Sequence, residues 1–451
     1  MKFNEAQMEK YRSRTVRSKE LWQQTKTLIP TGHAGGMGAF GEHPIVVDHA
    51  KGCWLWDVDG NEYLDLRLGD WVLIHGHSDE DIRNAVYEQM GKVVQVGAPE
   101  RNMGYRMAEL LVERMPSVEK VRFFASGTDA NLCAIRLARG YTGRSKIARS
   151  IGGYHGTSDT LMVGRSVLRA PEDEIPLGIQ SSAIDEIVQI PYNDPDGAEA
   201  IIRQHVSDIA AVIIEPVMTA AGMVEGTTEY LQRLRDVTTE LGIVLIFDEV
   251  VTFSVAYGGG QAHFGITPDL TTMGKVIGGG LPVSAVGGRT DIMDLLEPDA
   301  HDGVAPMGVM ATFGGNSASL AAGIACLQKL TPEAHDRMNA LGDRIRSTIN
   351  GFGEKYAVPL HATGLGNLIG VHWAEERVID DATLRKDDRE KIQNINLVLD
   401  NEGFYQTFTG LFLLSTAIGS EEVDAFLAAF ERALHTLEYV VPELAHAEAN
   451  G

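Results

Sequence analysis

Cysteine is scarce in this sequence. Its 451 residues include three cysteines, Cys53, Cys133 and Cys326, and no two of them have the close spacing of a zinc site. Widely separated single cysteines also give no disulfide framework. We therefore expect a protein of a reducing compartment, the cytoplasm, without a metal site.

Basic side chains are outnumbered by acidic ones. The chain has 39 lysines and arginines against 62 aspartates and glutamates, and its formal net charge is -23. The electric field of so acidic a protein repels nucleic-acid phosphates and anionic lipid surfaces, so we expect neither nucleic acids nor membranes as partners. It does not exclude an anionic cofactor, because backbone N–H groups in a local pocket can hold a phosphate.

Long apolar runs are also missing. No stretch approaches the roughly 20 apolar residues of a membrane-spanning helix. Residues 1–23 are charged throughout and lack the apolar core of a signal peptide. We expect a protein that is neither secreted nor embedded in a membrane. With 44% hydrophobic residues, the chain can form two or three folded units with large cores.

Short apolar strands alternate with helices in the middle of the chain. Five apolar runs have the length of buried strands: residues 121–125, 146–149, 210–215, 243–248 and 284–287. Short strands buried on both faces, with helices between them, predict a mainly parallel α/β sheet.

The segments on either side of this region have a different pattern. Residues 1–70 begin with a helix and continue into a small antiparallel meander. Residues 318–451 are mostly helical, starting with residues 318–330 and ending with the amphipathic stretch 421–441. We predict a large domain over residues 71–317 and a smaller α+β domain made by the two terminal segments.

A Ser-Gly-Thr turn joins one predicted strand to a helix. Ser126, Gly127 and Thr128 direct two hydroxyls and successive backbone N–H groups at one spot, with the positive end of the helix dipole behind them. A phosphate fits such a turn. The alternative is an ordinary helix cap formed by Ser126 or Thr128.

Another predicted strand ends in a carboxylate. Asp248 closes the apolar run 243–248, at the edge where open α/β sheets bind ligands. Beside a pyridine ring, an ionised Asp248 would keep the ring nitrogen protonated and make the ring an electron sink. A magnesium ligand or a helix cap is the alternative.

Lys275 is a single cation among small and apolar residues, between Gly274 and the glycines at 278–280. Apolar surroundings favour the neutral amine, a nucleophile that forms an imine with an aldehyde. The alternative is an ordinary lysine of a surface loop.

The three motifs could bind a single cofactor together. The Ser-Gly-Thr turn would hold a phosphate, Asp248 would pair with a ring nitrogen, and Lys275 would form an imine with an aldehyde. In these motifs the chain resembles the class III aminotransferases of fold type I, and among them most the glutamate-1-semialdehyde aminomutases and their relatives. The likeness runs over nearly the whole chain. Its motifs are residues 57–63, 75–77, 126–128, 154–156, 248–250 and 272–280.

The resemblance implies the transferase fold of enzymes that depend on pyridoxal 5'-phosphate, with a mainly parallel seven-stranded sheet flanked by helices. Lys275 would bind this cofactor as a Schiff base and carry a proton between the substrate carbon and the cofactor. Asp248 would pair with the pyridine nitrogen. Val250 would pack on one face of the ring and Tyr154 would stack on the other.

The resemblance also assigns the phosphate contacts. Ser126, Gly127 and Thr128 would hold the phosphate within one chain. Thr312 matches a threonine that reaches the phosphate from a second subunit, which implies a homodimer with active sites at the subunit interface. A tetramer built from such dimers stays open.

Four further residues are expected near the site without a direct contact to the cofactor being assigned to them. Glu215 matches a family position near the cofactor, where a structural role and a chemical role are both open. We expect His155 to support Tyr154, with proton chemistry as the alternative. His75 and His77 are interpreted as turn residues.

Arginine is missing where the relatives use it for a substrate carboxylate. The aminomutases carry an arginine in the N-terminal glycine-rich loop, and β-amino acid transaminases carry arginines there and near the C-terminal strand. The family usually carries a third arginine shortly after the segment that corresponds to residues 248–250. The matching residues of this chain, 32–40, 405–411 and 251–255, contain no arginine. Because arginine forms a two-bond fork that a neutral residue does not replace, we expect a substrate other than glutamate-1-semialdehyde. Arg67 or Arg101 is the alternative source of a carboxylate contact.

The expected substrate is a more apolar or differently anchored amine. Its predicted contacts are Met37, Phe40, Trp71, Phe253 and Phe408. For Trp71, burial in an ordinary core is the alternative.

We interpret the chain as an intermolecular aminotransferase acting between a small amine or amino acid and a keto or aldehyde acceptor. An intramolecular aminomutase or a racemase uses the same cofactor machinery, but a transaminase needs a second substrate. A non-catalytic protein that binds pyridoxal phosphate is a third possibility. The donor, the acceptor, the stereochemical preference and the pathway stay open.

Overall fold

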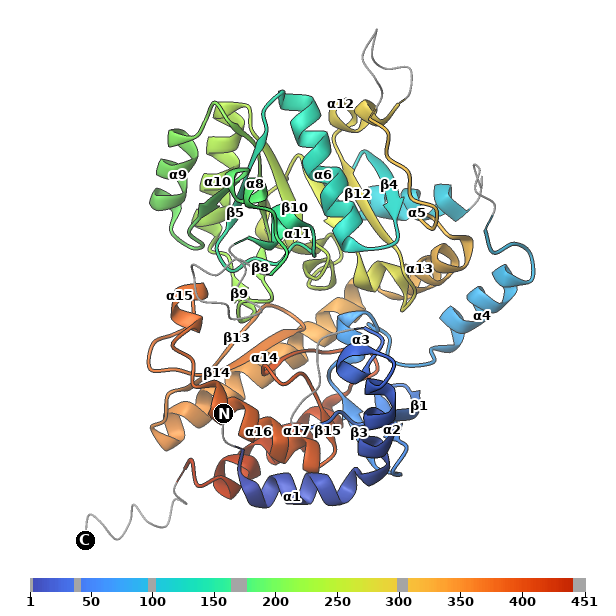
Figure 1. The fold of residues 1–451 in the computed structure, drawn as a ribbon, viewed down its shortest axis with the longest axis vertical. Coiled ribbons are helices and arrows are strands. Elements are labelled where there is room, and N and C mark those ends of the chain that lie inside the picture. The colour runs from blue at the N-terminus through green and yellow to red at the C-terminus, as the bar shows by residue number, and fades with distance from the viewer. Residues whose placement is uncertain (1–2, 36–41, 96–102, 164–176, 298–306, 441–451) are drawn as a thin grey trace. The chain divides into compact units, whose positions relative to one another are not determined.

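The computed structural model describes residues 3–35, 42–95, 103–163, 177–297 and 307–440 (Figure 1). The chain forms two compact units, and each is described by itself. The large unit comprises Glu80–Asp336 and Ile379–Ala382, and the small unit comprises Met1–Asp79, Arg337–Val378 and Thr383–Gly451. The domain limits drawn from the sequence stay a prediction.

A seven-stranded sheet forms the centre of the large unit, in the order β4-β12-β11-β10-β7-β5-β6. Its strands are β4 (Lys120–Phe124), β5 (Lys146–Ser150), β6 (Ile187–Ile190), β7 (Ile209–Ile214), β10 (Val244–Asp248), β11 (Leu270–Met273) and β12 (Ser284–Gly288). Neighbouring strands run parallel, except that β12 is antiparallel to β11 and to β4. The predicted mainly parallel sheet is confirmed.

The central strands carry no polar face because both of their faces are covered. Every residue of β7, β10, β11 and β12 is buried. The helix α6 (Gly127–Thr142) lies along the sheet and contacts β7, β11 and β12 (Figure 1). Strands covered in this way read as continuous apolar runs, which is why the sequence pattern predicted β7, β10 and β12.

Helices flank this sheet. The large unit also contains α4 (Glu80–Met90), α5 (Met103–Arg114), α7 (Asp159–Met162), α8 (Ser181–Asp185), α9 (Pro195–Gln204), α10 (Thr228–Leu241), α11 (Gly259–Phe264), α12 (Thr290–Met293), α13 (Ser317–Lys329) and the hairpin β8 (Val217–Met218) and β9 (Val224–Glu225). Side chains define several helix starts: Ser126, Thr227 and Asn316 accept backbone N–H bonds at the N-termini of α6, α10 and α13.

The small unit has two smaller sheets. One is the expected antiparallel meander of β1 (Val47–Lys51), β2 (Trp54–Asp57) and β3 (Glu62–Asp65), which β15 (Phe404–Tyr405) extends in parallel. The other contains β13 (Leu360–Thr363), β14 (Leu368–Trp373) and β16 (Leu411–Leu413). Its helices are α1 (Glu5–Arg14), α2 (Val16–Lys26), α3 (Leu68–Trp71), α14 (Pro332–Tyr356, from Arg337 onward), α16 (Arg389–Asn401) and α17 (Ser420–Thr436), with α15 (Asp381–Leu384) at the sequence boundary of the units.

Aromatic side chains fill the core of the small unit. The ring of Phe426 on α17 lies 5.3 Å from that of Phe412 and 6.1 Å from that of Phe430. Met8 and Tyr11 of α1 belong to a second buried cluster, which also contains Leu397 of the C-terminal segment. The N-terminal and C-terminal segments thus share one unit. Within the described ranges, no helix is both long and apolar enough to cross a membrane.

Candidate active site

The Ser-Gly-Thr turn forms the start of α6. Ser126 is the N-cap residue: its Oγ accepts a 3.3 Å hydrogen bond from Asp129 N, and it donates to Asp129 Oδ2 at 2.7 Å. Ser284 Oγ, at the start of β12, donates to the carbonyl oxygen of Ser126 at 2.6 Å. The turn is therefore a helix cap as well as a candidate phosphate site, and its backbone is fixed to the sheet.

Val250 lies between two glycines that are far apart in the sequence. A Cβ atom added to Gly127 would lie 3.1 Å from Val250 Cγ2, and one added to Gly274 would lie 3.2 Å from Val250 Cγ1. The phosphate turn, the residue two after Asp248 and the residue before Lys275 are thus in contact. Larger side chains at either glycine would push Val250 out of place.

The loop that carries Tyr154 reaches the same place. Thr157 N donates to Thr128 Oγ1 at 3.3 Å. Gly156 has a φ of 96°, and a Cβ there would collide with the side chain of Thr128. The Tyr154 loop therefore approaches the phosphate turn closely because residue 156 is glycine.

Asp248 is held by a buried network at the end of β10. Its Oδ2 accepts from Asn131 Nδ2 at 2.8 Å and from His155 Nδ1 at 2.8 Å, and its Oδ1 accepts from Val250 N at 3.1 Å. Asn131 Oδ1 accepts in turn from Thr272 Oγ1 on the neighbouring strand, at 2.7 Å. Only 4% of Asp248 is exposed, so these partners replace water.

His155 has a different part from the one expected. It was predicted to support Tyr154, but its ring is the second donor to Asp248. Burial lowers the pKa of His155, which favours the neutral ring. Its Nε2 has no hydrogen-bond partner within the described residues.

Glu215 lies at the end of β7 and holds the Tyr154 loop. Its Oε1 accepts from Tyr154 N at 2.9 Å, and its Oε2 accepts from the backbone N of Thr219 at 3.2 Å and from the Thr219 hydroxyl. Burial, followed by the nearby charge of Asp248, raises the pKa of Glu215 to about 7. A proton on this carboxyl at neutral pH relieves the repulsion between the two acids.

Lys275 follows β11 directly. Thr272 on β11 pairs with Asp248 on β10, so Lys275 comes three residues beyond the level of the carboxylate. Lys275 is half-buried, and its φ of 50° lies in the left-handed region, where a non-glycine residue is strained. Such outliers cluster at functional sites because the surrounding structure must enforce them.

Thr312 is exposed on the turn that precedes α13. Gln95 Nε2 donates to the carbonyl oxygen of Thr312, and Asn316 Nδ2 donates to that of Val94 at 3.1 Å. The turn is thus fixed to the segment that follows α4.

The five predicted substrate contacts are dispersed. Trp71 and Phe408 belong to the small unit, where Trp71 is buried and Phe408 half-buried. Phe253 belongs to the large unit and is fully buried, so of the set it is the least suited to touch a substrate. Met37 and Phe40 lie outside the described residues.

Sequence reasoning missed two members of the site and misassigned a third. Asn131 and Thr272 were not singled out, and His155 was given another part. One signal in the sequence could have indicated Asn131: it is an amide on a helix face that is otherwise formed by alanine, leucine, isoleucine and cysteine side chains.

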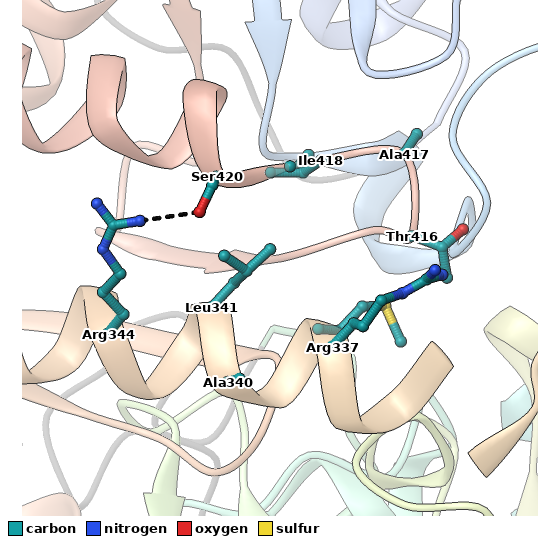
Figure 2. Close-up of a pocket in the computed structure, with 10 residues that line it drawn as sticks. Arg337, Ala340, Leu341, Arg344, Thr416, Ala417, Ile418 and Ser420 are labelled. Atoms are coloured by element: carbon teal, nitrogen blue, oxygen red, sulfur yellow. Dashed lines mark hydrogen bonds between the residues drawn. The ribbon is translucent and has the colours of Figure 1, made fainter. Parts of the chain in front are cut away.

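A cavity of about 600 Å³ opens in the small unit, between α14 and the start of α17 (Figure 2). Arg344 on α14 donates to Ser420 Oγ across it, at 3.1 Å. Its lining also includes Arg337, Leu341, Thr416 and Ile418. None of the predicted site residues lines this cavity, so we assign it no part in the reaction.

Known proteins share this sequence and fold along most of the chain. A protein from Staphylococcus aureus named glutamate-1-semialdehyde 2,1-aminomutase 1 is 39% identical over 436 residues, covering 93% of this chain and 99% of that protein. An ω-transaminase from Sphaerobacter thermophilus superposes with a TM-score of 0.87 at 36% identity, covering 93% of this chain and 97% of its own. A β-phenylalanine aminotransferase from Variovorax paradoxus gives 0.88 at 32% identity, with 97% and 98% covered.

Fold, site and these relatives define an enzyme that depends on pyridoxal phosphate. The model of the family described as aminotransferase class-III matches residues 37–434. The chain belongs to the class III aminotransferases. The family, the fold, the enzymatic nature and the cofactor predicted from the sequence are confirmed at the level of this family.

The residues present fit that cofactor. Because residues 127 and 274 lack a Cβ, the phosphate turn and the segment of Lys275 both approach Val250 closely, which brings the proposed anchors of the cofactor together. An ionised carboxylate has about four acceptor positions. Three positions of Asp248 are used in the contacts above, which leaves one on Oδ1 for the N–H of a pyridine ring.

Proposed function

We propose that the chain is an intermolecular transaminase whose cofactor site is formed at the carboxyl ends of β10 and β11. The proposal depends above all on the meeting of three distant motifs: Val250, two residues after Asp248, touches both the phosphate turn at Gly127 and Gly274, the neighbour of Lys275. When bound, pyridoxal phosphate supplies an electron sink for a carbanion at the substrate carbon.

The chain's own residues have distinct tasks in this proposal. Lys275 attaches the cofactor through its amine and afterwards moves the proton at the reacting carbon. Asp248 holds the proton on the ring nitrogen. Val250 and Tyr154 orient the ring from its two faces. The N–H groups of α6 and the side chains of Ser126 and Thr128 bind the phosphate.

The substrate in this proposal is an amine without the carboxylate anchor of glutamate-1-semialdehyde. Residues 32–40, 251–255 and 405–411 supply no arginine fork. The solved relatives named as an ω-transaminase and a β-phenylalanine aminotransferase, at 36% and 32% identity, support an acceptor-dependent reaction. Trp71 and Phe408 are the aromatic contacts that we assign to such an amine.

A glutamate-1-semialdehyde aminomutase is the second candidate. The observation in its favour is the name carried by relatives at 37% and 39% identity over nearly their full length. An aminomutase moves the amino group within one molecule, so it needs no separate acceptor.

A two-armed assay separates the candidates. One arm gives the purified protein, loaded with pyridoxal phosphate, a panel of amines together with a keto acid or aldehyde acceptor. The other arm gives it glutamate-1-semialdehyde alone. We expect amino transfer that stops when the acceptor is left out. Efficient conversion of glutamate-1-semialdehyde to the isomer with its amino group on carbon 1, at a low KM, would sink the transaminase proposal.

We also propose that the working form is a homodimer in which Thr312 completes the partner's phosphate site. Large apolar side chains of the large unit are exposed on α4, on α5 and on the turn around Thr312. They include Tyr87 (81% exposed), Met90 (55%), Tyr105 (66%), Met310 (95%) and Phe313 (63%). The hydrogen bonds of Gln95 and Asn316 join the end of α4 to this turn. Exposed apolar side chains gathered in this way are typical of a protein interface.

Hybrid dimers test the shared site. In a mixture of Lys275→Ala and Thr312→Ala chains, one site of each hybrid has both Lys275 and a partner threonine, and the other site has neither. We expect low activity from each variant alone and activity restored by mixing or coexpression. Absence of complementation, or a monomer in sedimentation experiments, would contradict the shared site.

A further inference from the structure

Asn131 connects four segments through one buried amide. It lies in the second turn of α6, and 1% of it is exposed. Its Nδ2 donates to Asp248 Oδ2 at 2.8 Å and to the carbonyl oxygen of His155 at 3.1 Å. Its Oδ1 accepts from Thr272 Oγ1 at 2.7 Å. The helix of the phosphate turn, the strand of Asp248, the Tyr154 loop and the strand that leads to Lys275 therefore meet at this side chain.

The bonds to Asp248 determine which of its oxygens stays available. Asn131 and His155 both donate to Oδ2, while Oδ1 receives only the N–H of Val250 in the contacts described. Two donors on the same oxygen fix the rotation of the carboxylate about its own axis. Oδ1 is then the oxygen with an acceptor position left for the ring nitrogen.

The bond to Thr272 adds a constraint that His155 does not provide. Thr272 pairs with Asp248 across β10 and β11 and stands three residues before Lys275. Asn131 thus links the side chain of Asp248 to the strand that delivers Lys275. The ring of His155 forms a hydrogen bond to Asp248 only, since its Nε2 has no partner within the described residues. The two donors are therefore not equivalent.

We propose that Asn131 is a positioning residue for the reaction, which presents Asp248 Oδ1 to the cofactor ring and keeps Asp248 in register with the strand of Lys275. This inference rests on the proposed cofactor site and deepens it. It does not depend on whether the reaction is a transamination or an intramolecular exchange, because both need the protonated ring.

Three isosteric variants separate positioning from mere stability. Asn131→Leu keeps the volume of the side chain and removes all its hydrogen bonds. Thr272→Val removes only the bond between Thr272 and Asn131. Thr271→Val is the matched control: Thr271 is a fully buried threonine of the same strand, and its hydroxyl bonds Ser117 at 2.8 Å and Gln261 at 3.0 Å rather than the Asp248 network.

The experiment uses the protein loaded with pyridoxal 5'-phosphate and reads three quantities. They are the pH dependence of the visible absorbance of the bound cofactor, the dissociation constant of the cofactor, and kcat and KM for an active amine. We expect Asn131→Leu to shift the pH profile of the absorbance and to lower kcat roughly 10- to 100-fold with a smaller change in KM, the usual range for a group that orients a reacting residue. Thr272→Val should change both in the same direction by a few-fold. Thr271→Val should alter only the melting temperature.

The outcomes are distinguishable. If Asn131→Leu loses stability but keeps the absorbance profile and kcat of Thr271→Val, Asn131 is structural and the inference is wrong. If Asn131→Leu does not fold, the difference between Thr272→Val and Thr271→Val decides, and identical behaviour of these two overturns the inference. Failure of the proposed site looks different: the wild-type protein would then bind no cofactor at Lys275, as borohydride reduction and peptide mass spectrometry would show.

Discussion

The end of the sheet in the large unit and the left-handed turn of α3 (Leu68–Trp71) in the small unit are organised differently. At the sheet end, Asp248 is held by side chains 117 and 93 residues away in the chain. In the turn, part of the contacts are local: Asp65 Oδ1 accepts from the backbone N of Arg67 at 2.8 Å and of Leu68 at 2.9 Å. Arg67 also donates to the hydroxyl of Tyr405 at 3.0 Å, 338 residues away.

Backbone strain is concentrated in the turn, although Lys275 at the sheet end also has a left-handed φ of 50°. Leu68, Gly69, Asp70 and Trp71 have φ angles of 52°, 63°, 61° and 73°, four consecutive residues in the left-handed region. Each non-glycine residue in that region costs roughly 1–2 kcal/mol. Arg67 stabilises the turn through a 2.7 Å ion pair with Asp70. The network at the sheet end joins distant segments of the large unit, whereas the strain in the turn is concentrated in four consecutive residues. We therefore expect substitutions at the sheet end to change chemistry and those in the turn to change substrate preference.

The largest effect should come from Lys275→Ala. Removing the amine that attaches the cofactor and moves the proton should lower kcat by roughly four orders of magnitude or more, with the fold intact. Steady-state rates and far-ultraviolet circular dichroism measure the two quantities. Lys146→Ala is the control, because Lys146 pairs with Asp208 at the other end of the sheet and should leave the rate unchanged. Substantial turnover by Lys275→Ala would refute the assignment.

Asp248→Asn should have the next largest effect. The substitution keeps the size of the side chain and removes its charge, so the ring nitrogen loses its counter-ion. We expect kcat to fall roughly 100- to 1000-fold, the range for loss of one preorganised electrostatic group. Glu249→Gln is the matched control: the neighbouring buried carboxylate is bonded to Gly260 and Gln261, and its loss should lower the melting temperature more than kcat. Equal kcat losses in both variants would contradict the difference in roles.

The residues with local signatures could be predicted from the sequence. The five predicted strands correspond to β4, β5, β7, β10 and β12, since each has a run of mostly apolar or small residues bounded by helical sequence. The turn at Ser126, the strand-end Asp248 and the glycine-flanked Lys275 each have a local pattern. β6 and β11 were not among the predicted runs. The four residues of β11, Leu270–Met273, include two threonines and lead straight into the glycine-rich motif.

Partners across long separations could not be predicted in the same way. The bond between Asn131 and Asp248 spans 117 residues, and nothing in either local pattern specifies it. The direction of His155 toward Asp248 depends on the parallel pairing of β5 with β7 and of β7 with β10. These contacts are properties of the folded sheet, so only the structure reveals them.

Glu215→Gln tests the electrostatic coupling at the sheet end. Because burial raises the pKa of Glu215 from about 4.5 to about 7, the folded chain keeps a proton there that the unfolded chain has released. Stability should therefore fall as the pH rises from about 4.5 to about 7, by about 3 kcal/mol in the free energy of unfolding. Glu215→Gln should lack this slope in urea unfolding between pH 5 and pH 8.

Asp248→Asn provides the second arm of that experiment. The charge of Asp248 is the lesser cause of the raised pKa, after burial, so its removal should reduce the slope without abolishing it. Identical slopes in the wild type and in Glu215→Gln would show that Glu215 does not titrate in this range.

The smallest expected effect concerns Trp71, which lies in the left-handed turn of the small unit. Trp71→Phe keeps an aromatic ring in the left-handed turn but shortens it, so the backbone strain is unchanged while the contact surface shrinks. If the turn selects the substrate, the ratio of kcat/KM for a bulky aromatic amine to that for a small aliphatic amine should change by roughly 10-fold, as one lost apolar contact predicts. The absorbance of the bound cofactor should stay as in the wild type, because that depends on the sheet end. A variant with an altered cofactor spectrum and an unchanged ratio would mean that the turn supports the chemistry rather than the choice of amine, and the division between the two regions would be wrong.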